Sequence, residues 1–65
     1  MDATLEKLLS DLQEIKLLEI EAQKIYKALL PLITQERDKT IVQGIIEDEK
    51  RHEQIAQECI DVLQA

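Results

Sequence analysis

The only proline of this chain, Pro31, lies near the middle of 65 residues that otherwise follow the spacing of helices. From about residue 4 to 30, apolar side chains recur at every third or fourth position among good helix formers, and the pattern resumes over residues 36–63. Proline lacks a backbone donor and biases the preceding residue, Leu30, away from the helical conformation. We therefore predict two long helices joined by a connection over residues 31–35.

The short connection determines how the two helices are arranged. A few residues between long helices favour an antiparallel hairpin. Thr34 is the expected N-cap of the second helix, and Glu36 would then lie favourably in its first turn. The predicted fold class is all-α, with one domain over residues 1–65.

The length of the chain indicates that the hairpin does not act alone. Small domains rely on disulfides, a metal or oligomerisation, and Cys59, the only cysteine, excludes a disulfide within the chain. Additional apolar residues widen the apolar side of each helix: Leu8, Leu18, Ile25, Ile41, Ile46, Ile55 and Val62. A second hairpin is the simplest cover for them. We predict a homodimer that forms a four-helix bundle, or a larger even-numbered homo-oligomer.

Charge and composition exclude two classes of partner. The net charge is −6 and Tyr26 is the only aromatic residue, whereas nucleic-acid surfaces need basic patches and stacking side chains. No apolar run reaches membrane-spanning length, and charge from Asp2 onward does not match a secretory signal. We expect no nucleic-acid partner, no membrane partner and a cytoplasmic location.

Alternating steps of three and four residues define the helix faces that we expect to be buried in the bundle. The face of the first helix comprises Leu12, Ile15, Glu19, Ala22, Tyr26, Leu29 and Ile33. The face of the second comprises Val42, Ile45, Glu49, His52, Ala56, Cys59 and Leu63. Cys59 is expected there as a small buried apolar residue. Glu19, Glu49 and His52 are unexpected, because a buried carboxylate costs several kcal/mol unless it is paired, protonated or bound to metal.

Glu19, Glu49 and His52 are spaced so that they can meet at one level of the hairpin. Glu49 and His52 are one helical turn apart, and Glu19 lies almost as far from the connection as Glu49 does. Two hairpins related by a two-fold axis would bring together four carboxylates and two imidazoles, the ligand set of di-iron and di-manganese bundle proteins. We predict two metal ions per dimer, with iron preferred and manganese or zinc as substitutes.

Glu19, followed seven residues later by Tyr26, and the run Glu49-Lys50-Arg51-His52 together resemble rubrerythrin-related members of the ferritin-like superfamily. The half-length chain and the interval from Glu19 to Glu49 are most similar to the encapsulated ferritins. Those proteins build a ferroxidase centre across a dimer of two-helix subunits. The chain departs from them at Ile25, where they commonly carry a tryptophan.

The resemblance implies a role for each site residue. Glu19 and His52 would be terminal ligands, Glu49 would bridge two irons, and the Tyr26 hydroxyl would donate to a ligand carboxylate. The implied reaction is oxidation of Fe(II) to Fe(III), for iron storage or detoxification. The implied partner is an encapsulin shell, inside which the protein would be located.

Two other classes of protein share parts of this pattern. A structural or adaptor hairpin dimer would use the same helices without redox activity. A peroxidase like rubrerythrin would use the same ligands, but it receives electrons through an iron site with four cysteines, so this chain would need a separate reductase. A ferroxidase needs only Fe(II) and an oxidant, which makes it the favoured prediction.

Overall fold

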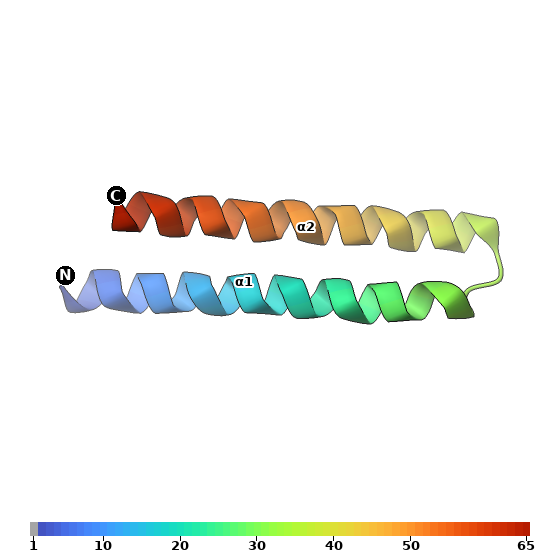
Figure 1. The fold of residues 1–65 in the computed structure, drawn as a ribbon, viewed down its shortest axis with the longest axis horizontal. Helices are drawn as coiled ribbons and strands as arrows, with labels where there is room; N and C mark the ends of the chain where they lie inside the picture. Colours follow the sequence, from blue (N-terminus) through green and yellow to red (C-terminus); the bar gives the residue numbers. More distant parts are fainter. Residues whose placement is uncertain (1) are drawn as a thin grey trace.

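The computed structural model describes residues 2–65 as two antiparallel helices joined by a short turn (Figure 1). Helix α1 spans Ala3–Leu29, a 3₁₀ turn η1 spans Leu30–Leu32, and helix α2 spans Glu36–Gln64. The Cα atoms extend over 51 × 15 × 11 Å, and both termini lie at the same end of the hairpin. The predicted all-α hairpin is confirmed.

The chemistry of individual residues explains the helix ends. Asp2 caps α1, because its carboxylate accepts a hydrogen bond from the Leu5 amide at 2.8 Å. Leu30 keeps helical dihedrals, contrary to the expectation, because η1 continues the helical sense of α1 up to Pro31. Thr34 is not the N-cap of α2. Gln35 holds that position with an extended backbone, so the helix begins one residue later than a Thr34 cap requires.

The core between α1 and α2 is small and contains one polar residue. Its buried apolar members are Val42, Ile46, Ala56 and Ile60, all from α2. Gln23 of α1 is buried beside them, with 7 % of its surface exposed. No other polar or charged residue is buried among residues 2–65. Two helices alone therefore bury only a narrow strip of each apolar side.

The faces that meet within the hairpin are rotated relative to the predicted ones. Ile15, Leu29, His52 and Cys59 were expected in the buried faces, but they are exposed. Ile46 and Ile60 are buried in their place. The apolar side of each helix is wider than one neighbouring helix can cover. Within the hairpin, each helix therefore buries a strip of its neighbour that only partly coincides with the predicted face.

Many large apolar side chains consequently remain on the surface. The exposed ones are Leu8, Ile15, Leu17, Leu18, Ile25, Leu29, Leu32, Ile41, Ile55 and Val62. Exposed apolar surface on this scale marks an interaction site more often than it marks bare surface.

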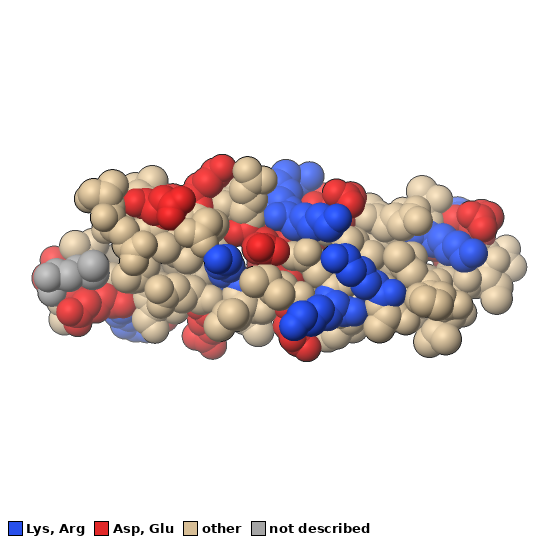
Figure 2. All heavy atoms as spheres, in the orientation of Figure 1, with Lys and Arg blue, Asp and Glu red and all other residues tan. Residues whose placement is uncertain are grey.

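Figure 2 shows basic side chains gathered around the middle of the face in view. Across residues 2–65, neither helix is long and apolar enough to cross a membrane.

Candidate metal centre

Three of the predicted site residues come together on one side of the hairpin. Glu19 of α1 and Glu49 and His52 of α2 each offer a ligand atom, and these atoms lie within 4.8 Å of one another. Among residues 2–65, no other group of three or more His, Cys, Asp or Glu side chains has this spacing. The predicted convergence of these three residues at one level is thus observed.

The cluster has a shielded base and an open side. The Glu19 side chain is 20 % exposed, whereas that of His52 is 49 % exposed. Nδ1 of His52 lies 3.6 Å from Oε2 of Glu19, which is too far for a hydrogen bond. The contact can be an ion pair only when His52 is protonated, and it leaves one side of the imidazole open to solvent.

One oxygen in this cluster is buried without a hydrogen-bond donor. No group among residues 2–65 donates to Oε2 of Glu19, although that atom is shielded from solvent. Leaving a buried acceptor unsatisfied costs about 1–3 kcal/mol, and more for a charged group. A divalent cation beside Glu19 would satisfy it. Tetrahedral zinc, with bonds of about 2.0–2.2 Å, holds two ligand atoms roughly 3.3–3.6 Å apart. Ligand atoms up to 4.8 Å apart would therefore move closer by side-chain rotation on binding.

The proximity of two carboxyl groups alters the protonation of Glu49. The nearby Glu19 carboxylate can accept a hydrogen bond from the protonated form of Glu49, and this raises the pKa of Glu49 above its usual value. Partial desolvation and repulsion by Glu19 raise this pKa further, with a smaller repulsion from Asp48, whereas His52 lowers it. A bound cation would act in the opposite direction, because it favours the deprotonated carboxylate.

Two apolar grooves extend from the cluster toward the open end of the hairpin. The nearer groove, of about 270 Å³, is lined by Leu12, Ile15, Glu19, His52, Ile55, Ala56 and Cys59. The other, of about 350 Å³, is lined by Leu8, Leu12, Cys59, Val62 and Leu63. Leu12 and Cys59 belong to both, so the two grooves are continuous. We call this combined feature the apolar groove.

Tyr26, the fourth predicted site residue, is not joined to the cluster by the contacts of Glu19. The tyrosine is half-buried on α1, and its hydroxyl donates no hydrogen bond to Oε2 of Glu19. The role assigned to this hydroxyl stays a prediction. In a dimer, a carboxylate of the second chain could accept a hydrogen bond from the Tyr26 hydroxyl.

No known protein family, curated protein or solved structure matches this chain. The resemblance to encapsulated ferritins stays a prediction, which depends on Glu19, Tyr26, Glu49 and His52 and on the intervals between them. What the protein binds, and which reaction it performs, must be inferred from its own residues.

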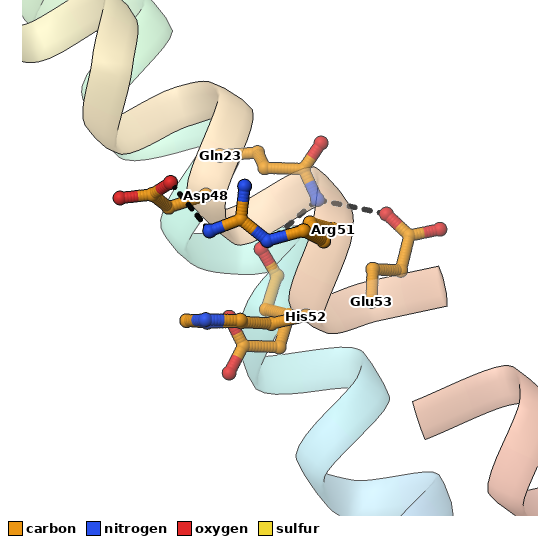
Figure 3. A network of polar contacts seen from close by, with 6 residues as sticks. Gln23, Asp48, Arg51, His52 and Glu53 are labelled. Carbon is orange, nitrogen blue, oxygen red and sulfur yellow. Dashed lines mark hydrogen bonds and ion pairs between the residues drawn. The ribbon is translucent and has the colours of Figure 1, made fainter. Parts of the chain in front are cut away.

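A second polar group beside the cluster was missed by the sequence reasoning. Nε2 of Gln23 donates to Oε1 of Glu53 at 2.7 Å and to the backbone oxygen of Glu19 at 3.3 Å (Figure 3). On α2, Arg51 donates to Asp48 at 2.8 Å, so Asp48 has a partner of its own. A signal was present in the sequence, because Gln23 and Glu53 follow Glu19 and Glu49 by one helical turn.

Proposed function

We propose that two copies of this hairpin pair over Glu19, Glu49 and His52 and oxidise Fe(II) to Fe(III) at the completed site. The observation that carries this proposal is the convergence of the three side chains within 4.8 Å around a buried carboxylate oxygen that lacks a donor. A structural hairpin gains nothing from such a group, since apolar residues at these positions would pack without the cost of desolvated charge.

A homodimer is supported by what one chain lacks. One hairpin supplies two carboxylates and one imidazole, which is half of the ligand set that bundle proteins use for two metal ions. His52 is half-exposed beside the apolar groove, and Ile55 and Val62 are exposed along it. A second hairpin on this side would bury those side chains and supply the remaining ligands. The result would be a ferritin-like four-helix bundle, alone or within a larger even-numbered assembly.

The donor set suits iron as the substrate. Carboxylate oxygens are hard ligands, so four of them with two imidazoles stabilise Fe(III) more than Fe(II) and favour oxidation. Each of two Fe(II) ions loses one electron. The two electrons and two protons convert dioxygen to hydrogen peroxide, or hydrogen peroxide to two molecules of water. Manganese or zinc can occupy a site of this kind, and zinc would do so without redox chemistry.

Each site residue has a distinct part in this proposal. Glu19 and His52 would hold an iron ion from two helices, and Glu49 would bridge two ions. The Tyr26 hydroxyl orients a ligand carboxylate from the partner chain. The biological role would be iron detoxification or storage. An encapsulin shell would provide the compartment for the oxidised product.

Rapid mixing of metal-free protein with Fe(II) in air tests the reaction. We expect a fast rise in Fe(III) absorbance that saturates near two irons per dimer. Glu19→Ala, Glu49→Ala and His52→Ala should each reduce this phase sharply, and Tyr26→Phe should alter it less. Glu58→Ala, which removes an exposed acid outside the cluster, is the matched control and should react like the wild type. If the wild type oxidises iron no faster than the triple alanine variant, the ferroxidase proposal is wrong.

Light scattering of the metal-loaded protein tests the assembly separately. We expect a mass of two chains or an even multiple of two, because the half-site and the apolar groove are completed by a second hairpin. A folded, helical monomer at micromolar concentration would contradict the dimer.

A further inference from the structure

Gln23 is the one polar or charged residue among residues 2–65 that is buried. It is 7 % exposed and follows Glu19 by one turn of α1. Its side-chain amide joins both helices, since it donates to Glu53 of α2 at 2.7 Å and to the backbone of Glu19 at 3.3 Å. Leaving a buried amide without hydrogen-bond partners is destabilising, because its lost contacts with water are not replaced. The Gln23 amide is therefore satisfied only when the two helices are aligned as they are in this structure.

This contact constrains the alignment of α1 and α2 in a way that the apolar core does not. Apolar burial is non-directional, and the core side chains Val42, Ile46, Ala56 and Ile60 are of similar chemistry, so a small slide or rotation costs them little. A hydrogen bond tolerates only a few tenths of an ångström. Single buried polar residues fix the register of paired helices in the same way, at some cost in stability.

The contact also lies where the register matters most. Glu53 directly follows His52 and lies one turn after Glu49, while Gln23 is bonded to the backbone of Glu19 itself. We infer that Gln23 and Glu53 are positioning residues, which hold Glu19 on α1 opposite Glu49 and His52 on α2. The inference rests on the proposed metal site. Neither residue is assigned as a ligand, because neither belongs to the group whose ligand atoms converge.

A second interhelical hydrogen bond provides a matched control. Nζ of Lys16 donates to Oε1 of Gln57, and this contact also joins α1 to α2 in a partly buried position. Gln57 follows Glu53 by one turn, but neither Lys16 nor Gln57 is bonded to a cluster residue. Gln57→Leu therefore removes an interhelical bond without releasing Glu19.

Titration of the metal-free full-length chain with Co(II) alone tests the inference. The measurements are the Co(II) affinity, the visible spectrum of bound Co(II), which reports ligand geometry, and the melting temperature of the metal-free protein. Gln23→Leu should lower the Co(II) affinity about tenfold or more and broaden the spectrum. The melting temperature should stay the same or rise, because leucine suits the apolar core.

Variants of Glu53 separate the hydrogen bond from its charge. Glu53→Gln keeps an acceptor for Gln23 and should bind Co(II) nearly as the wild type does. Glu53→Ala removes the acceptor and should lose affinity about as Gln23→Leu does. The Glu53 variants also provide the test if Gln23→Leu does not fold.

Three results would overturn the inference. Wild-type affinity and spectrum in both Gln23→Leu and Glu53→Ala would contradict the positioning role alone and leave the metal site intact. An equal loss in Gln57→Leu would show that any loosening of the hairpin has this effect. A wild-type chain that does not bind Co(II) would overturn the proposed site together with the positioning role.

Discussion

Two neighbouring polar groups of the hairpin differ in whether their hydrogen bonds are complete. Gln23 and Glu53 are matched, with a bond of 2.7 Å between donor and acceptor. One turn away, Oε2 of Glu19 is buried with no donor among residues 2–65, and Glu19 raises the pKa of Glu49. A matched pair needs no further partner, whereas a shielded carboxylate oxygen without a donor is an unsatisfied acceptor, which a bound cation would satisfy. The comparison thus separates a polar pair that joins the two helices from a carboxylate whose oxygen is unsatisfied within the hairpin.

The largest expected effect is stabilisation of the unmatched cluster by metal. Adding Zn(II) or Mn(II) to the metal-free protein should stabilise it by about 2.7 kcal/mol when the free metal exceeds its dissociation constant 100-fold. Thermal unfolding followed by circular dichroism measures this shift. Glu19→Ala should not respond, whereas Glu58→Ala should respond like the wild type. An equal response in Glu19→Ala would place the binding site elsewhere.

Leucine substitutions in the two polar groups should change the stability of the metal-free protein in opposite directions. Glu49→Leu removes a carboxylate that Glu19 repels, so it should raise the melting temperature while abolishing metal binding. Glu53→Leu leaves the Gln23 amide without its acceptor and should cost about 1–3 kcal/mol. Chemical unfolding of both variants without metal makes the comparison. Strong destabilisation by Glu49→Leu would reveal a structural partner of Glu49.

Glu49 of the cluster should make the stability of the metal-free protein depend on pH, whereas the pair of Gln23 and Glu53 should not. Because the folded state raises the pKa of Glu49, folded protein holds this proton more tightly than unfolded protein does. The stabilising contribution of that proton is complete below the ordinary glutamate pKa of about 4.3 and is lost as the pH rises through the raised value. Lowering the pH from neutral toward about 5 should therefore favour the metal-free fold at this site.

Glu49→Gln and Glu53→Gln are the variants that assign this pH dependence. Urea unfolding at several pH values gives the free energy of unfolding of the metal-free protein as a function of pH. As the pH is lowered, this free energy should rise less in Glu49→Gln than in the wild type. Glu53→Gln should keep the wild-type slope at this site. An unchanged slope in Glu49→Gln would mean that another carboxyl group takes up the proton.

The sequence predicted the hairpin and the cluster because both depend on spacing alone. Pro31 and the helical periodicity determine two antiparallel helices, and intervals along each helix bring Glu19, Glu49 and His52 to one level. The rotation about each helix axis could be predicted only in part, because apolar residues continue around the helix and periodicity does not say which strip the neighbour covers. Val42 and Ala56 of the predicted face are buried in the hairpin, together with Ile46 and Ile60 from outside it. The contact between Gln23 and Glu53 was missed for the same reason, since its partners are brought together by that rotation.

The smallest predicted effect is that of Gly44→Ala. This variant tests whether a partner helix covers α2 near Gly44 in the assembled protein. Gly44 lies within α2, and a Cβ added there has nothing within 4 Å in the hairpin. Glycine inside a helix is less favourable than alanine by about 0.5–1 kcal/mol, so Gly44→Ala should stabilise the protein by that amount. Chemical unfolding measures the difference, with the exposed residue Gln43→Ala as a neighbouring control of small effect. A loss of stability in Gly44→Ala that appears only in the assembled protein would show that a partner helix packs closely against Gly44, and the covered surface would then extend one turn beyond Asp48 toward the connection.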